Sequence, residues 1–298
     1  MTTDASTGHV AGDAPALQSP LPGGPARIPE VRELWSLLHG EIMEPLVRRQ
    51  LRRSLGFCPR HTWLYAAVEV ELWKDPAGAS PGHQPFDVCV LHADLLGHAA
   101  EQLREVAARR HYRPLGAARP LAGEGTCLIC ERSRFVETEL SPTDLSVGYA
   151  AVDVPPLVAQ VNRLAETARW CRETVDVWRG AVCPRCLDQY LPATLASSIG
   201  DVDAVTMISE AEVGQLEGPR TPPCRRHLLD GLFLSRDDAQ LIEARVGALR
   251  SRLVRLLEWM TFGGRRTASA DLRAAWIETL GWFAGWSVPL GLVQTSSR

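Results

Sequence analysis

Four short motifs in this chain place a cysteine three positions before a second cysteine or a histidine. They are Cys58-Pro59-Arg60-His61, Cys127-Leu128-Ile129-Cys130, Cys183-Pro184-Arg185-Cys186 and Cys224-Arg225-Arg226-His227. Thiolate sulfur and imidazole nitrogen are zinc ligands, and two of them at this spacing can reach one ion from a turn that leads into a helix. Six cysteines and two histidines make two complete sets of four ligands. The sequence therefore predicts two structural zinc ions.

Two pairings of the motifs satisfy the ligand count. In the first, each site is Cys₃His and joins neighbouring motifs: Cys58 and His61 with Cys127 and Cys130, then Cys183 and Cys186 with Cys224 and His227. In the second, the two Cys-x-x-Cys motifs form a Cys₄ site and the two Cys-x-x-His motifs form a Cys₂His₂ site. We favour the first pairing, which follows sequence order. An iron–sulfur cluster is a less favoured occupant because no motif has a third close cysteine.

Two further cysteines lie outside these motifs. Cys89 and His92 have the same spacing but fall in the middle of a long predicted helix, where they share one face. We interpret them as a core cysteine and a partly buried histidine, with recruitment to a metal site as the alternative. Cys171 has no partner in the sequence and is predicted to pack in the core.

The elements that must position these motifs are predicted to be helices. Apolar residues recur at three- and four-residue steps along most of the chain, which is typical of amphipathic helices. Proline follows the first cysteine in two motifs and suits the first turn of a helix, whose positive dipole end favours thiolate. The expected helices cover 31–43, 45–55 with Gly56 as its cap, 59–72, 86–110, a short stretch after Cys127, 157–178, Ser235–Met260 and Ser269–Phe283.

The predicted fold class is all-α, with a multi-helix, two-lobed architecture stapled by metal sites at helix N-termini. A tail over residues 1–27 is rich in Gly, Pro, Ala, Ser and Thr and is predicted to be disordered. The first helical metal-binding lobe is expected over 28–140 and the second over 157–298. Residues 141–156 are predicted to link them.

Composition narrows the function classes. The chain has 298 residues, with 35 acidic and 32 basic side chains and a net charge of -3, which does not favour nucleic-acid binding by bulk charge. Lys74 is the only lysine, so 31 of the 32 basic residues are arginine, a bias that we ascribe to a GC-rich bacterial genome. No apolar run is long enough to span a membrane, and no secretory signal is visible. We therefore expect a cytoplasmic protein, in which reduced cysteines favour metal over disulfides.

A resemblance supports the metal-binding interpretation. Glu131 and Arg132 follow the Cys127 motif, a long predicted helix follows the Cys224 motif, and the first motif is preceded by Leu37-Leu38-His39-Gly40-Glu41, Glu44-Pro45, Leu51-Arg52 and Gly56-Phe57. With these features the chain resembles an uncharacterised bacterial family of helical domains with repeated Cys-x-x-Cys and Gly-Phe-Cys-x-x-His motifs. The resemblance covers patches of 31–64 and 127–260. The resemblance implies a metal-binding helical fold and no known reaction.

The chain departs from the family pattern at one place. Family members carry a Cys-x-x-Cys one helix before the Gly-Phe-Cys-x-x-His motif, but 31–35 here contains no cysteine. This departure is a further reason to expect that Cys127 and Cys130 complete the first site.

The favoured function is that of a structural zinc protein that acts as a protein-interaction or regulatory module, with an unidentified protein partner and no assigned catalysis. One alternative is a zinc- or thiol-dependent enzyme or redox switch that uses Cys183 and Cys186. Another is nucleic-acid binding through a stripe of four arginines on the second helix, Arg48, Arg49, Arg52 and Arg53.

The aromatic residues of the last helix leave one more alternative. Trp276, Trp282, Phe283 and Trp286 cluster there, and we interpret them as docked on the core. The alternative is an exposed apolar patch that binds a partner protein.

Overall fold

A computed structural model describes residues 19–72, 84–108, 119–136, 145–147, 150–152, 154–197, 223–230, 236–262 and 268–294. The regular secondary structure among these residues is helical apart from one antiparallel pair of short strands, β1 (Leu145–Val147) and β2 (Ala150–Val152), in which Ser146 lies opposite Ala151. The predicted all-α class is confirmed. No helix of the described part is long and apolar enough to cross a membrane.

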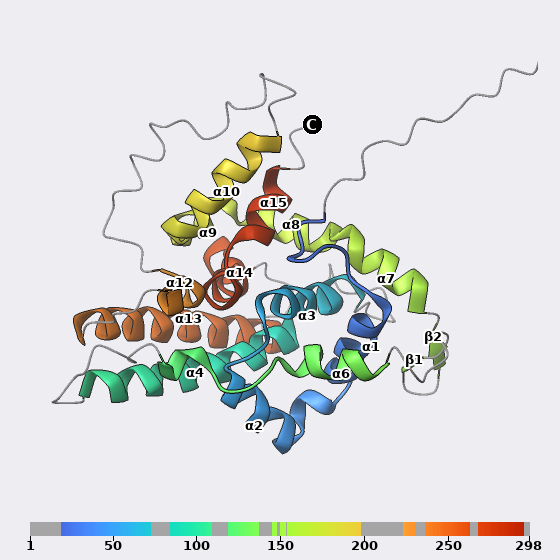
Figure 1. The fold of residues 1–298 in the computed structure, drawn as a ribbon, viewed down its shortest axis with the longest axis horizontal. Helices are drawn as coiled ribbons and strands as arrows, with labels where there is room; N and C mark the ends of the chain where they lie inside the picture. Colours follow the sequence, from blue (N-terminus) through green and yellow to red (C-terminus); the bar gives the residue numbers. More distant parts are fainter. Residues whose placement is uncertain are drawn as a thin grey trace, which may run out of the picture.

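The helices follow one another in the order shown in Figure 1. They are α1 (Ile28–Leu38), η1 (Glu41–Met43), α2 (Pro45–Ser54), α3 (Pro59–Leu72), α4 (Phe86–Ala108), α5 (Arg119–Ala122), α6 (Leu128–Val136), α7 (Val154–Arg163), α8 (Ala165–Glu173), α9 (Val175–Trp178), η2 (Arg179–Ala181), α10 (Pro184–Ser197), α12 (Arg225–Asp230), α13 (Arg236–Phe262), α14 (Ala270–Ala284) and α15 (Ser287–Gln294). The segments η1 and η2 are single 3₁₀ turns.

Most helix boundaries fall near their predicted positions, and the end of the first helix differs for a local reason. The first helix ends at Leu38, because Gly40 takes a φ of 136° and leads into η1. Helix α2 ends in a left-handed turn in which Leu55 and Gly56 both have positive φ, and the Gly56 N–H bonds the Leu51 carbonyl at 2.7 Å. Ser269 caps α14 as predicted, whereas Ser235, the other predicted cap, lies outside the described residues.

The segment predicted as one helix over 157–178 forms three helices, α7, α8 and α9. The second of them is capped by a side chain from a distant part of the chain. Leu164 has a left-handed φ of 49°, and the chain restarts there as α8. The Glu71 carboxylate of α3 accepts hydrogen bonds from the backbone N–H groups of Glu166 and Thr167, at 3.2 and 2.9 Å. A distant glutamate thus satisfies the free N–H groups at the start of α8, a role that a local cap usually fills.

Glu69, two residues earlier on α3, does the same for α4. Its two carboxylate oxygens accept the N–H groups of Asp87 and Val88, at 2.7 and 2.8 Å. Both glutamates are buried, so α3 anchors the N-termini of two neighbouring helices.

The core is built around α3 and α14, whose residues are buried over nearly their whole length. Helix α13 runs alongside α4, and α3 contacts α1, α7, α8 and α14 (Figure 1). One cluster of buried apolar residues includes members from both predicted lobes, 28–140 and 157–298. The two ranges are therefore packed against each other through a shared core.

The packed fold begins before residue 28. Within the predicted tail over 1–27, Leu21 and Ala26 are buried, and Arg60 donates hydrogen bonds to the carbonyl oxygens of Pro22, Gly24 and Pro25 at 2.7–2.8 Å. Residues 19–27 are thus held against the start of α3.

The aromatic cluster of the last helices lies in the core. Trp276, Trp282, Phe283 and Trp286 are each at most 4% exposed. Trp286 stacks on Trp178 with ring centroids 5.9 Å apart. The interpretation of these rings as core residues is confirmed, and the alternative of an exposed aromatic patch is wrong.

Candidate metal centres

The first candidate centre joins the N-termini of α3 and α6. His61 Nδ1 lies 3.3 Å from Cys58 Sγ, 3.4 Å from Cys127 Sγ and 3.3 Å from Cys130 Sγ. The Sγ atoms of Cys58 and Cys130 are 3.8 Å apart. Four ligand atoms from two motifs 66 residues apart therefore surround one point.

The second candidate centre joins the N-termini of α10 and α12. His227 Nδ1 lies 3.4 Å from Cys183 Sγ, 3.4 Å from Cys186 Sγ and 3.3 Å from Cys224 Sγ. The Sγ atoms of Cys186 and Cys224 are 3.6 Å apart. The structure thus has the Cys₃His pairing that follows sequence order, and the Cys₄ plus Cys₂His₂ alternative is wrong.

The distances between ligand atoms test whether a metal ion fits. Tetrahedral zinc, with Zn–S of about 2.3 Å and Zn–N of about 2.0 Å, separates two sulfurs by about 3.8 Å and a sulfur from a nitrogen by about 3.5 Å. The observed separations are 3.6–3.8 Å and 3.3–3.4 Å. Both clusters therefore have the size and the donor set of a closed tetrahedral site.

Glycine brings the two motifs of the first centre together. Gly123 has a φ of +73°, and a Cβ atom there would lie 2.3 Å from the Ser54 carbonyl oxygen at the end of α2. The next residue, Glu124, donates its N–H to the Arg53 carbonyl at 2.6 Å. Because α2 leads into the Cys58 motif and Gly123 precedes the Cys127 motif, this close contact between backbones holds the two ligand-bearing segments next to each other.

His61 has a second partner that fixes its ring. Its Nε2 atom lies 3.1 Å from Glu30 Oε1, while Nδ1 faces the sulfurs. Glu30 is fully buried and also accepts hydrogen bonds from Arg60 at 2.7 and 2.8 Å. A carboxylate behind a histidine ligand is the usual outer partner in zinc sites, since it fixes the tautomer and makes the ring a better donor. Although burial opposes ionisation, the hydrogen bonds from Arg60 and His61 hold the pKa of Glu30 well below its usual range.

The histidine of the second centre lacks this partner. His227 Nε2 is buried and has no hydrogen-bond partner among the described residues. Arginines instead surround this centre: Arg185 Nη1 donates to the His227 carbonyl at 3.4 Å, and Arg245 Nη2 donates to the Ala181 carbonyl at 2.8 Å. Three thiolates on a divalent ion leave one net negative charge at each centre. The half-buried Arg245 can balance this charge at the second centre, and Arg60 can balance it at the first.

The thiols of the first centre share protons unevenly. A hydrogen bond from Cys58, with a further one from His61, holds the pKa of the Cys127 thiol below its usual range, and the same contact raises the pKa of Cys58. Three thiols this close together cannot all ionise without a compensating positive charge. A bound cation supplies that charge, which is a second reason why the cluster fits a metal ion.

The two centres differ in exposure. All four ligands of the second centre are buried, whereas the three cysteines of the first centre are only half-buried. Solvent therefore has better access to the first.

The other cysteines form no such cluster within the described part of the chain. Cys89 and Cys171 are fully buried. His92 Nδ1 bonds the Val88 carbonyl at 2.8 Å, and burial lowers the pKa of His92 to about 4. Cys89 is a core residue as predicted, whereas His92, predicted to be partly buried, is fully buried.

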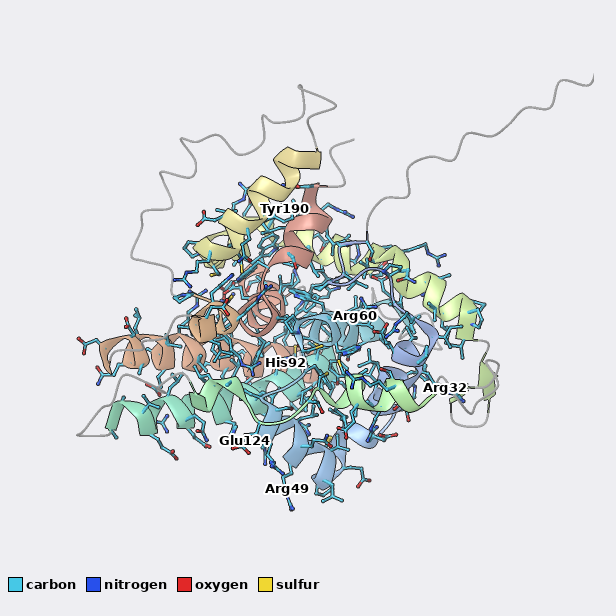
Figure 2. The ribbon with its side chains drawn as sticks, in the orientation of Figure 1. Arg32, Arg49, Arg60, His92, Glu124 and Tyr190 are labelled. Atoms are coloured by element: carbon cyan, nitrogen blue, oxygen red, sulfur yellow. The ribbon has the colours of Figure 1, made fainter. Side chains whose placement is uncertain are left out.

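Most of the arginine stripe on α2 is engaged by acidic side chains. Arg52 makes two hydrogen bonds to Asp94, at 3.0 and 2.7 Å, and Arg48 lies 3.6 Å from the same carboxylate. Arg53 lies 3.6 Å from Glu124. Figure 2 shows the fourth arginine of the stripe, Arg49, at the outer edge of the molecule. Arg60 of α3, which is not part of the stripe, lies within the body of the molecule.

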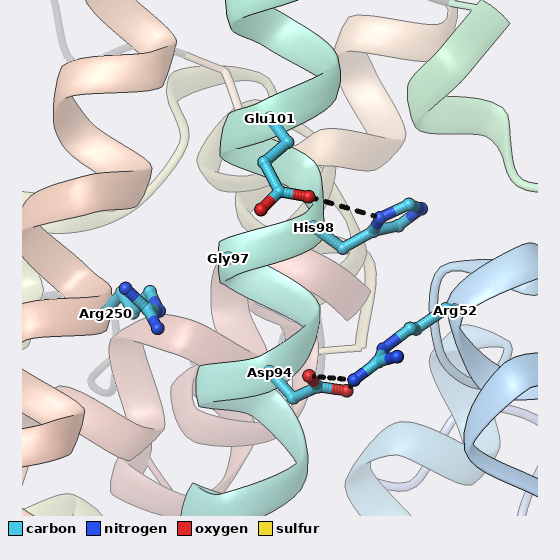
Figure 3. A pocket seen from close by; sticks show the side chains of 6 residues that line it. All are labelled: Arg52, Asp94, Gly97, His98, Glu101 and Arg250. Carbon is cyan, nitrogen blue, oxygen red and sulfur yellow. Dashed lines mark hydrogen bonds and ion pairs between the residues drawn. The ribbon is translucent and has the colours of Figure 1, made fainter. Parts of the chain in front are cut away.

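A polar pocket of about 270 Å³ lies beside the Arg52–Asp94 pair (Figure 3). Arg250 of α13 reaches over Gly97 of α4, and His98 lies 4.0 Å from Glu101. Cationic and anionic groups balance there, and the pocket contains no ligand of either metal centre.

Two residues beside the candidate centres lay outside the sequence predictions: Glu30, which bonds His61, and Arg245, which bonds the Ala181 carbonyl. The spacing between Arg27 and Glu30 is that of a capping box, which places Glu30 in the first turn of α1 but gives no sign of His61. These contacts are long-range and leave no local pattern.

Comparisons with protein-family models, with curated proteins and with solved structures find no match to this chain. The resemblance to the bacterial family of helical domains therefore stays a prediction, and the two Cys₃His clusters are the features from which a function is argued.

Proposed function

We propose that this protein is a helical scaffold that holds two structural zinc ions and acts by binding a partner protein rather than by catalysis. The observation that carries the proposal is the closed set of four ligands in each cluster. A catalytic zinc site keeps a position for water, usually with three protein ligands, whereas structural sites fill all four positions from the protein.

Zinc is the favoured occupant because of the ligand type. Soft thiolates with one imidazole in tetrahedral spacing suit zinc, while an iron–sulfur cluster is generally held by four cysteines. All eight cysteines are free thiols, including six within reach of a metal ion, which supports a reducing compartment such as the cytoplasm.

The alternatives have weaker support. Thiol–disulfide exchange requires access to the attacking sulfur, but Cys183 and Cys186 are buried. Nucleic-acid binding through the α2 stripe is also less favoured, because Arg48 and Arg52 share the Asp94 carboxylate. Neither alternative uses the closed geometry of the two centres.

Metal content per chain tests the proposal. Protein purified without added metal should contain two zinc ions by elemental mass spectrometry, and Cys130→Ala and Cys186→Ala should each lose one. Cys171→Ala is the matched control, since it removes a buried cysteine that belongs to neither centre. Iron with visible absorbance would replace zinc, and a stable protein without metal would contradict the proposal.

A further inference from the structure

We propose that Arg225, which lies between two ligands of the second metal centre, is a positioning residue for the first centre, so that the two centres bind metal cooperatively. This inference rests on the proposed metal binding. The Arg225 side chain carries most of this coupling between the two sites.

The side chain of Arg225 is buried, and its hydrogen bonds go to backbone carbonyls outside the second centre. Nε donates to the Leu121 carbonyl at 2.6 Å, and Nη2 donates to the carbonyls of Ala122 at 3.0 Å and Ser54 at 3.3 Å. Only 7% of the residue is exposed. Arg226, its neighbour, is exposed.

The three carbonyl groups belong to the segments that lead into both motifs of the first centre. Ser54 ends α2, four residues before Cys58, and Ala122 ends α5, five residues before Cys127. The guanidinium of Arg225 therefore links the end of α2 to the end of α5 by hydrogen bonds. The tight contact of Gly123 with Ser54 lies at the same place.

A second contact runs in the opposite direction. Trp63, two residues after the ligand His61, donates its indole N–H to the Gly285 carbonyl at 3.1 Å. Gly285 adjoins the second centre, since a Cβ atom there would lie 3.8 Å from Cys186 Sγ. Each centre thus contributes a side chain that bonds the backbone next to the other centre.

The physical consequence is thermodynamic linkage. Metal at the second centre fixes Cys224 and His227, and thereby the short helix α12 that carries Arg225. The guanidinium then holds the two segments of the first centre in place before metal arrives, which lowers the entropy cost of binding there. Linkage is reciprocal, so metal at the first centre must favour binding at the second by the same factor.

Site-resolved zinc occupancy tests this coupling in the full chain. In zinc buffers of graded free concentration, alkylation by N-ethylmaleimide followed by peptide mass spectrometry reports Cys127 and Cys130 separately from Cys183 and Cys224. We expect Arg225→Gln to weaken zinc binding at the first centre by at least about 5-fold, the lower range of typical couplings. The exposed neighbour gives the matched control: Arg226→Gln should leave the affinity unchanged.

A double-mutant comparison separates positioning from general destabilisation. Cys186→Ala, which disables the second centre, should also weaken the first, and adding it to Arg225→Gln should weaken the first centre little further. Trp63→Phe keeps an aromatic ring but removes the N–H donor, so it provides an independent variant should Arg225→Gln fail to fold. It should weaken the linkage by a smaller factor.

Two different results of the zinc-binding experiment would separate failure of the coupling from failure of the proposed function. If the wild-type chain binds two zinc ions but the affinity of the first centre is unchanged by Cys186→Ala or by Arg225→Gln, the coupling is overturned while zinc binding stands. If the wild-type chain binds no zinc, the proposed function itself is contradicted.

Discussion

The contact between Glu30 and His61 gives the first centre a partner that the second lacks among the described residues. Glu30 is held by Arg60 on one side and bonds the histidine at 3.1 Å on the other, which sets the Nδ1 atom toward the three sulfurs. Removing such an outer partner typically weakens metal binding by 10–100-fold, that is by about 1.4–2.7 kcal/mol.

We therefore predict that Glu30→Gln weakens zinc binding at the first centre by about 10-fold or more. Competition with a chelator of known affinity measures this change, with cysteine alkylation to identify the centre. Glu33→Gln is the control one turn along α1, since Glu33 faces Arg132 at 3.8 Å and no metal ligand. Equal affinities in Glu30→Gln and the wild type would show that the carboxylate does not support the ligand.

A second prediction at this scale concerns Glu69, which caps α4 from inside the core. Burial, with a contribution from Asp87, raises the pKa of Glu69 to about 8, although the backbone N–H groups of Val88 and Asp87 oppose this shift. The folded state thus retains a proton that the unfolded chain loses near the ordinary glutamate pKa of 4.5. Stability should therefore fall as pH rises between these two values, by at most about 1.4 kcal/mol per pH unit for one proton.

Urea unfolding of the wild type and Glu69→Gln between pH 5 and pH 8 measures this contribution. Protonation of the metal ligands affects both proteins, so the difference between their free energies of unfolding isolates Glu69. As pH rises, the free energy of unfolding of the wild type should fall relative to that of Glu69→Gln. A difference that is constant with pH would mean that Glu69 titrates alike in the folded and unfolded chains.

At the scale of elements, the motifs and most helices could be predicted from local patterns, while the breaks between helices could not. The three-residue spacing of the motifs and the prolines after Cys58 and Cys183 predict metal ligands at helix N-termini, and the structure places these cysteines and histidines in two clusters at such positions. The break at Leu164 depends on Glu71, which is 93 residues away in the chain and therefore outside any local window. The pairing of the four motifs likewise follows from packing, because both pairings satisfy the same ligand count.

The turn at Gly123 offers a test of how an element positions the ligands. Gly123→Ala places a Cβ atom against the Ser54 carbonyl, so the segment before Cys127 must move away from the end of α2. Gly125→Ala is a matched control, because Gly125 also has a positive φ, of +90°, but has open space around it. The control should cost only the left-handed strain of about 1–2 kcal/mol.

We predict that Gly123→Ala costs more stability than Gly125→Ala and also weakens zinc binding at the first centre, with the second centre unaffected except through the coupling described above. Thermal unfolding in zinc buffer measures stability, and alkylation of Cys127 and Cys130 measures occupancy. Equal behaviour of the two variants would show that the contact between Gly123 and Ser54 does not set the ligand spacing.

At the scale of the whole molecule, the two Cys₃His clusters belong to segments that pack on one shared core. Helix α13 lies along α4, and the buried apolar residues of 28–140 and 157–298 belong to one cluster. Under the proposed zinc binding, each ion ties together two segments that are far apart in sequence, and this restricts the unfolded chain as a cross-link does. Loss of either ion should therefore affect the whole molecule.

The unequal burial of the centres predicts unequal release of their ions. A chelator or a competing thiol must reach the sulfurs, and those of the first centre are half-buried while those of the second are fully buried. We predict that excess EDTA removes zinc in two phases of one ion each, with the faster phase leaving Cys127 and Cys130 open to alkylation.

The same experiment connects release to the coupling of the centres. Once the first ion has left, the second centre loses the support that Trp63 gives at Gly285, so its release should be faster than in a chain whose first centre stays filled. Free zinc high enough to keep the first centre occupied should therefore slow the alkylation of Cys183 and Cys224. The slowing should exceed that expected from zinc binding at the second centre alone. Release of both ions in a single phase, with all six cysteines alkylated at one rate, would mean that ion loss follows global unfolding rather than the local burial of each centre.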